Sequence, residues 1–176
     1  DQPVELVRRP SGGRAVLHQG DLTYAVIASG FSSNRMQAYQ EICTFLIRGW
    51  QSLGIDLAYG EAGRGYIHNP NCFGTATAAD LITPDGVKLI GSAQLRRSNV
   101  ILQHGSMRLA PDPKLFEQVF GAKPMSYSIP QPESQIIQAL TEAAASCFGI
   151  ELQSRPLNPT EWDAISTLQA QLNRNL

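Results

Sequence analysis

Two long stretches of the chain place apolar residues at the three- and four-residue spacings of an amphipathic helix. In residues 34–53 the stripe consists of Tyr39, Ile42, Cys43, Leu46, Trp50 and Leu53. In residues 131–148 it consists of Ile136, Ile137, Leu140, Ala144 and Cys147. A glycine follows each stretch, at the position where a left-handed residue ends many helices. We therefore predict helices over residues 34–53 and 131–148, with Ser32 or Ser33 capping the first.

Shorter apolar runs between turn residues predict strands. The predicted strands cover residues 15–18, 22–28, 55–59, 80–83, 87–93, 100–104 and 150–153. Pro84-Asp85-Gly86 predicts a hairpin turn. We also predict a short helix over residues 113–120 and a last helix from Thr160, whose apolar stripe contains Trp162, Ile165, Leu168 and Leu172. Residues 60–77 have no periodicity and predict a mobile loop.

The mixture of strands and helices lacks regular βαβ alternation. This favours the α+β class, with a mixed β-sheet and flanking helices. A length of 176 residues with 43% hydrophobic and 16% charged residues suits one domain, residues 1–176, with a sizeable core. The chain does not begin with Met, so we expect that earlier residues of the protein are not shown.

Several functional classes find no support in the composition. A net charge of −1 gives no bulk attraction to nucleic acid or to an acidic membrane. The three cysteines have no CxxC spacing and the three histidines no metal-site spacing, so we predict no disulfide framework and no metal. No apolar run approaches the roughly 18 residues of a membrane span, and no signal peptide opens the chain. We expect a cytoplasmic protein.

The first candidate for chemistry is the segment from Arg8 to His18, which contains Ser11, Gly12 and Gly13. Adjacent glycines let the backbone approach a ligand closely, and arginines bind phosphate or carboxylate. A tight turn with solvated arginines explains the same residues equally well.

Cys72 and Lys88 form the second candidate. Cys43 and Cys147 fall on apolar helix faces and are predicted to pack in the core, whereas Cys72 lies in the glycine-rich loop. A loop thiol is able to hold an acyl group as a thioester, although an incidental free cysteine is the alternative. Lys88 precedes Gly91, Ser92 and Ala93, residues small enough for a ligand to lie against the strand. Alone, Lys88 reads as a solvent-facing lysine.

Two histidines, His18 and His104, each end an apolar strand beside small residues. Either one is able to orient a nucleophile or to deprotonate an incoming amine. A structural histidine with satisfied hydrogen bonds is an equal alternative for each.

Three ordered motifs together resemble the biotin/lipoate A/B protein ligase family. Arg8 to His18 is similar to the family's Arg-Arg-x-Ser/Thr-Gly-Gly motif. The stretch with Gly86, Lys88 and Gly91 to Gln94 is similar to its Gly-x-Lys-x-x-Gly-Ser-Ala-Gln motif, and Leu102-Gln103-His104-Gly105-Ser106 is the third. Gly-Arg-Ala-Val-Leu-His at residues 13–18 and Cys72-Phe73 are closest to the LipM-type octanoyltransferase branch.

The resemblance implies an acyltransferase that works through a cysteine thioester. Cys72 would take an octanoyl group from acyl carrier protein, and Lys88 would hold the acyl carbonyl oxygen. A lysine of a lipoyl domain or of glycine-cleavage H protein would then accept the group. The residues expected to bind substrate are Arg9, Ser11, Gly12, Gly13, His18, Tyr24, Gly91, Ser92, Ala93, His104 and Gly105. Changing Cys72 or Lys88 to alanine is expected to abolish transfer and leave the fold intact.

Three alternatives to octanoyl transfer stay open. The first is an ATP-dependent lipoate-protein ligase, and the second is an amidotransferase that moves octanoyl or lipoyl groups between lipoyl domains. The third is a non-catalytic acyl- or carrier-protein-binding module. No cofactor is expected for the transferase, whereas the ligase would need ATP and Mg²⁺. The resemblance also implies a further segment before the Arg8-Arg9 motif in family members. We expect that segment to be missing from the sequence, and its absence motivates the non-catalytic alternative.

Overall fold

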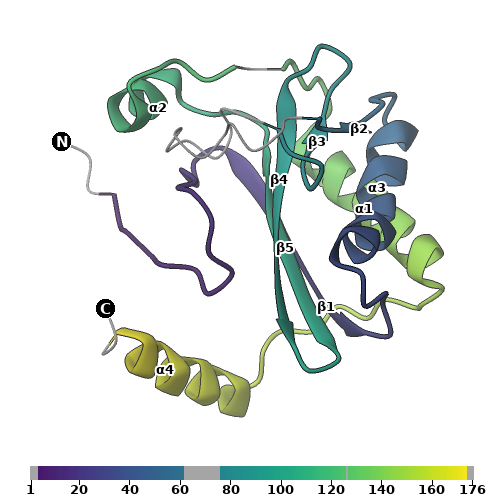
Figure 1. The fold of residues 1–176 in the computed structure, drawn as a ribbon, viewed down its shortest axis with the longest axis vertical. Helices are drawn as coiled ribbons and strands as arrows, with labels where there is room; N and C mark the ends of the chain where they lie inside the picture. The colour runs from purple at the N-terminus through teal and green to yellow at the C-terminus, as the bar shows by residue number, and fades with distance from the viewer. Residues whose placement is uncertain (1–3, 62–75, 126, 174–176) are drawn as a thin grey trace.

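The computed structural model describes residues 4–61, 76–125 and 127–173. In these residues the chain forms five strands and four helices (Figure 1). Their bounds are β1 (Asp21–Ser29), α1 (Arg35–Ser52), β2 (Ala58–Tyr59), β3 (Leu81–Ile82), β4 (Lys88–Arg97), β5 (Val100–Arg108), α2 (Pro113–Phe120), α3 (Glu133–Phe148) and α4 (Pro159–Asn173).

The strands form one sheet in the order β1-β5-β4-β3-β2. This confirms the predicted α+β class. Every pairing among the described strands is antiparallel, however, where a mixed sheet was expected. Strands β4 and β5 form the long central hairpin, and β1 pairs with β5 along its whole length.

Helices α1 and α3 cover one face of the sheet, which we call the inner face (Figure 1). Helix α1 inserts Ile42, Leu46 and Trp50 into the core, each with no exposed surface. Helix α3 packs on α1 close to Gly49, where an added methyl group would lie 2.8 Å from Leu140 Cδ2. The apolar stripes therefore form the helices predicted from their spacing, because burying them against the sheet removes apolar area from water.

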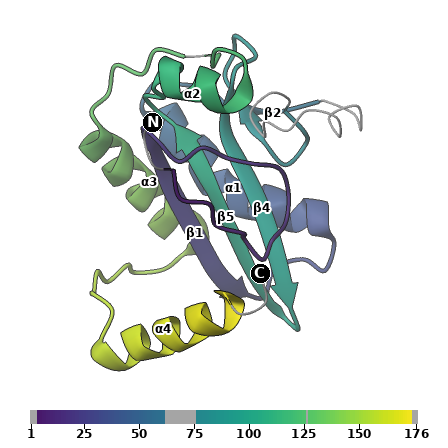
Figure 2. The same cartoon turned by 90° about the vertical axis from the view of Figure 1, so that its left-hand side faces the viewer.

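The opposite, outer face of the sheet is covered differently. Residues 4–20, here called the N-terminal segment, run in front of it without regular secondary structure (Figure 2). Helix α4 lies apart from the inner-face helices (Figure 1), and its Trp162 and Leu168 are more than half exposed. None of the helices in the described part of the chain is long and apolar enough to cross a membrane.

Several local predictions need correction. Residues 15–18 form only an isolated bridge at Ala15, and residues 150–153 form no strand, because a strand needs a partner that the local pattern does not supply. The cap of α1 is Asn34, whose side chain accepts hydrogen bonds from the Met36 and Gln37 amides, where a serine was expected. The hairpin about residues 84–86 is confirmed by the pairing of β3 with β4. Most of the predicted loop over residues 60–77 lies outside the described residues.

Candidate active site

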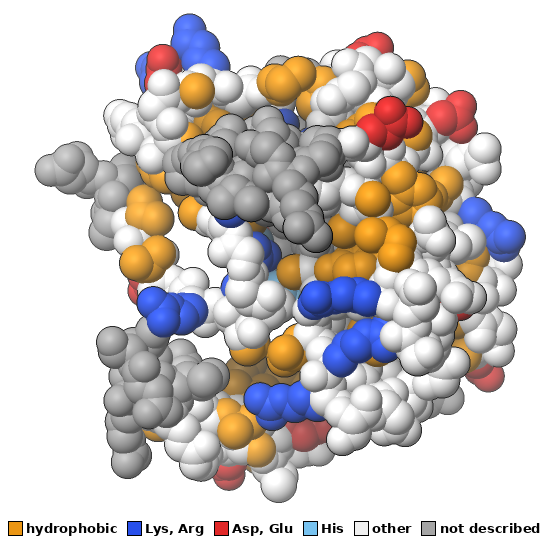
Figure 3. Space-filling model, viewed as in Figure 1, with side chains coloured by type: hydrophobic (Ala, Val, Ile, Leu, Met, Phe, Trp, Pro, Cys, Tyr) orange, Lys and Arg blue, Asp and Glu red, His pale blue; other side chains and the backbone are white. Residues whose placement is uncertain are grey.

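A cleft of about 960 Å³ lies between the N-terminal segment and the outer face of the sheet. Arginine and lysine side chains gather on the face shown in Figure 3. Nine of the predicted substrate-binding residues line the cleft: Arg9, Gly12, Gly13, His18, Tyr24, Gly91, Ser92, His104 and Gly105. The structure therefore brings together residues of all three sequence motifs.

The two glycines of the first motif give the N-terminal segment its shape. Gly12 and Gly13 have φ angles of +67° and +100°, which residues with a Cβ rarely adopt. The Gly12 N–H donates to the Arg9 carbonyl at 3.2 Å. The Arg9 guanidinium donates to the Arg14 carbonyl at 3.1 Å, and a methyl group on Gly13 would lie 2.5 Å from it. The turn thus folds the Arg9 side chain back against its own backbone at the cleft.

Ser11 and His104 meet across the cleft although they are 93 residues apart. Ser11 Oγ lies 2.7 Å from His104 Nε2. In the sheet register Ala25 and Ala93 flank His104 on the two neighbouring strands, so small side chains surround the ring. Burial lowers the pKa of His104 below its usual value, and the charges of Arg9 and His18 lower it further. The imidazole is therefore neutral at neutral pH.

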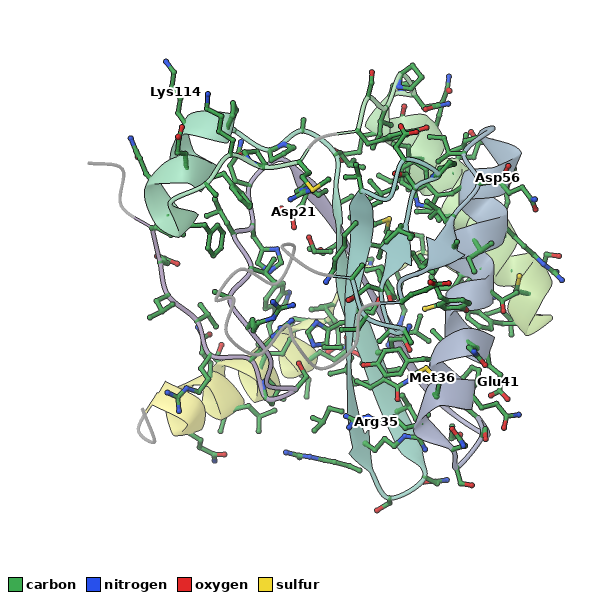
Figure 4. The ribbon with its side chains drawn as sticks, turned by 45° about the horizontal axis from the view of Figure 1, so that its top comes forward. Asp21, Arg35, Met36, Glu41, Asp56 and Lys114 are labelled. Atoms are coloured by element: carbon green, nitrogen blue, oxygen red, sulfur yellow. The ribbon has the colours of Figure 1, made fainter. Side chains whose placement is uncertain are left out.

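His18 has a different environment. Its Nδ1 lies 2.7 Å from a carboxylate oxygen of Asp21, and its side chain is 59% exposed. The same Asp21 oxygen accepts a hydrogen bond from the Ser106 hydroxyl. Figure 4 shows Asp21 between the N-terminal segment and the sheet. His18 is thus held by a buried carboxylate at the edge of the cleft.

Tyr24 crosses the inner face of the sheet directly over Gly105. Its hydroxyl lies 2.7 Å from Ser92 Oγ and accepts a hydrogen bond from Gln103 at 3.0 Å. A methyl group on Gly105 would lie 2.6 Å from Tyr24 Cε1, so only glycine leaves room for the ring. Gln103 also donates to the Cys43 thiol at 3.2 Å. Burial raises the pKa of Tyr24 far above its usual value and that of Cys43 to about 11, so both stay neutral.

Lys88 is buried, which corrects the interpretation as a solvent-facing lysine. Its Nζ forms an ion pair with Asp80 at 2.9 Å, and the two side chains are 3% and 5% exposed. Asp80 also accepts hydrogen bonds from the Thr77 amide and hydroxyl, at 2.8 and 2.9 Å. Lys88 is not among the residues that line the cleft. On β4 it lies two residues before Ile90 and four before Ser92, so its side chain is on the same, inner face of the sheet.

Asp80 is the residue that the sequence analysis missed. Its carbonyl accepts a hydrogen bond from the Gly60 amide, so Gly60 and Thr77 are both bound to Asp80. The predicted hairpin about residues 84–86 was an available signal, because it brings Asp80, at the start of its first strand, close to Lys88 on its second strand. Cys72, the predicted nucleophile, lies outside the described residues.

Comparisons with known proteins identify relatives of the chain. Residues 1–145 match the family model of the lipoyl protein ligase A/B catalytic domain. The chain is 32% identical to Octanoyltransferase LipM of Kyrpidia tusciae over 193 aligned positions, which cover 93% of this chain and 70% of that protein. It is 39% identical to Octanoyltransferase LipM of Bacillus subtilis over 123 positions, covering 63% of this chain and 44% of that protein.

Solved structures show the same fold. Lipoate-protein ligase A bound with ATP has a TM-score of 0.68 at 16% identity, covering 85% of this chain and 60% of that one. A bi-partite lipoate protein ligase from Thermoplasma acidophilum, described with its E2 lipoyl domain, has a TM-score of 0.61 at 17% identity. The match covers 85% of this chain and 59% of that one.

The fold and the motif-lined cleft define an α+β catalytic domain of the kind found in lipoate ligases and octanoyltransferases. The chain belongs to the lipoyl protein ligase A/B catalytic domain family. It spans 44% of the length of the B. subtilis relative and 70% of that from K. tusciae.

Proposed function

We propose that this chain is the catalytic domain of a protein octanoyltransferase. The observation that carries the proposal is the cleft that gathers residues of three motifs, in a chain 32–40% identical to proteins named Octanoyltransferase LipM. The donor is octanoyl-acyl carrier protein, and the acceptor is a lysine of a lipoyl domain or of glycine-cleavage H protein.

In the first half-reaction the Cys72 thiolate attacks the octanoyl thioester of the carrier. A new C–S bond to Cys72 forms, and the carrier leaves as a thiol once its sulfur is protonated. Lys88 stabilises the developing oxyanion with the positive charge of its ammonium group. In the second half-reaction the acceptor amine attacks the thioester, the C–N bond forms, and Cys72 is released.

An ATP-dependent lipoate-protein ligase is the second candidate. It is favoured by one specific observation, the fold shared with a lipoate-protein ligase bound with ATP. The cleft arginine Arg9 is suited to a phosphate. ATP and Mg²⁺ would be needed only for this activity. An amidotransferase between lipoyl proteins would use the same cysteine and lysine as the octanoyltransferase.

The deciding experiment is the intact mass of the protein after incubation with octanoyl-acyl carrier protein, with and without hydroxylamine. We expect an octanoyl adduct that hydroxylamine removes and that maps to Cys72. Cys72→Ala should lose the adduct, whereas Cys147→Ala, at a partly buried cysteine on α3, should keep it.

Other results of this experiment would replace the proposal. An unmodified wild-type protein that reacts only with lipoate and ATP would establish the ligase. Acylation by an octanoylated lipoyl protein but not by the carrier would establish the amidotransferase. No reaction with any donor, with carrier binding retained, would leave a non-catalytic acyl-binding module.

A further inference from the structure

The cleft is lined by positive charge without a matching negative charge. Arg8, Arg9 and Arg14 all line it, and no Asp or Glu of the described residues is among its lining residues. Arg8 is exposed, whereas Arg9 and Arg14 are half-buried. Salt screens partly buried charges less than exposed ones, so Arg9 and Arg14 keep more of their attraction for an anion. The cleft is therefore suited to an anionic ligand.

The Arg9 guanidinium is held in place but its charge is not neutralised. One of its nitrogens donates to the Arg14 carbonyl at 3.1 Å. The ion pairs within the described part of the chain join other residues, so Arg9 has no carboxylate partner there. A guanidinium has five N–H donors in a fixed fork. One bond to the backbone therefore orients the group and leaves donors for a ligand in the cleft.

The surroundings of His104 show that the positive charges act on one part of the cleft. Burial lowers the pKa of His104, and the charges of Arg9 and His18 lower it further, with no carboxylate of the described residues among the causes. The nearby Asp21 carboxylate is already bound by His18 and by the Ser106 hydroxyl. An anion beside Arg9 would therefore meet positive charge rather than an unpaired carboxylate.

Under the proposed function the donor carries such an anion. The octanoyl group of acyl carrier protein is a thioester of phosphopantetheine, and a phosphodiester joins this arm to the carrier. The phosphodiester is negatively charged at neutral pH, and arginine binds phosphate oxygens through two parallel N–H donors. The flexible pantetheine separates the phosphate from the thioester sulfur, so a phosphate site does not have to lie beside the reacting cysteine.

We propose that Arg9, with Arg8 and Arg14 around it, binds the phosphodiester of the donor's phosphopantetheine arm, an assignment that rests on the proposed function. The bound phosphate holds the arm at the cleft and takes no part in the bond changes of acyl transfer. A nucleotide phosphate has the same chemistry, so the two sources of phosphate have to be separated by experiment.

Calorimetric titration of the full chain measures the contribution of the phosphate to binding. The protein carries Cys72→Ala, so that no acyl group is transferred from the probes. Octanoyl-4′-phosphopantetheine and octanoyl-pantetheine differ only in the phosphate, and octanoyl-AMP carries a nucleotide phosphate instead. We expect octanoyl-4′-phosphopantetheine to bind about 10-fold or more tightly than octanoyl-pantetheine. This preference should shrink as the salt concentration rises.

Three further substitutions in this protein assign the preference to particular arginines. Arg9→Gln should remove most of it and leave the affinity for octanoyl-pantetheine unchanged. Arg8→Gln, at an exposed position, leaves the contact between Arg9 and the Arg14 carbonyl in place and should reduce the preference by about 2-fold or more. Arg48→Gln is the matched control, because this exposed arginine lies on α1, which covers the inner face. It should keep the full preference.

The outcomes distinguish this inference from the proposed function. Equal affinity for the two pantetheine probes would overturn the inference and leave the proposed function standing. An equal loss of both probes in Arg9→Gln would also overturn it, because Arg9 would then only shape the turn. Arg9-dependent binding of octanoyl-AMP without a preference for octanoyl-4′-phosphopantetheine would assign the phosphate to a nucleotide. A wild-type protein that shows the preference but forms no octanoyl adduct would overturn the proposed function and retain the phosphate site.

Discussion

The two faces of the sheet differ in how deeply their side chains are buried. On the inner face Ile90, Gln103 and Met107 have at most 1% of their surface exposed, and α1 and α3 cover them. On the outer face Ile27 is 72% exposed, and His104 lies between two alanines in an open cleft. The inner face of the sheet is thus packed against helices, whereas the outer face borders the cleft.

This difference separates the side chains that stabilise the domain from those that line the candidate site. Several polar side chains of the inner face are hydrogen-bonded to one another: Gln94 donates to Gln103, which in turn donates to Tyr24 and to Cys43. Such a network holds one arrangement of the core because an unpaired buried group is costly. The outer face has fewer such contacts near His104, where it borders the cleft.

The largest effect on stability is expected from Lys88→Ala. Removing the lysine leaves the Asp80 carboxylate buried without its cation, which costs about 3–5 kcal/mol of unfolding free energy. The expectation from sequence that this variant keeps its fold intact is therefore revised. Urea denaturation measures the loss, with exposed Lys114→Ala as the matched control within about 0.5 kcal/mol. Equal stability of the two variants would show that the Lys88–Asp80 pair contributes nothing.

A smaller effect is expected from Gly105→Ala. The added methyl group would lie 2.5 Å from the Gly91 carbonyl oxygen and 2.6 Å from Tyr24 Cε1, so the ring has to move. We expect a loss of about 1–3 kcal/mol in the free energy of unfolding. Thr23→Ala, at an exposed outer-face position, should change it by less than about 0.5 kcal/mol. If Thr23→Ala cost as much as Gly105→Ala, the two faces would not differ as described.

The smallest expected effect is on the pH dependence of the free energy of unfolding. The folded-state pKa of His104 is lowered below its ordinary value of 6.5, so the unfolded chain binds a proton at His104 more readily than the folded chain does. Its contribution to stability is therefore complete above pH 6.5 and is lost as the pH falls from there through the folded-state pKa. His104→Gln should flatten this part of the profile of unfolding free energy against pH. A profile identical to that of the wild type would contradict the assignment.

Much of the fold was predictable because its signals are local. Helix α2 begins and ends at the predicted residues 113 and 120, and α1 and α3 agree with prediction to within two residues at each end. Their apolar stripes need only the 3.6-residue period and a nearby cap. The failed strands, residues 15–18 and 150–153, depended on a partner strand, which a local pattern does not contain.

The candidate site was predictable as a set of residues but not as an arrangement. The motifs named nine of the residues that line the cleft. They did not show that Lys88 is buried against Asp80, nor that His104 rather than His18 faces small neighbours.

The sequence by itself determined the main helices, the hairpin about residues 84–86 and the family, since each rests on residues close together in the chain or on motifs in a fixed order. Only the tertiary structure decided that Ser11 meets His104 and that Lys88 meets Asp80. The physical reason is the alternation of side chains along a strand: a shift of one residue moves a side chain to the other face of the sheet. That register is set by long-range pairing of β1, β4 and β5, which brings residues 93 positions apart into hydrogen-bonding distance.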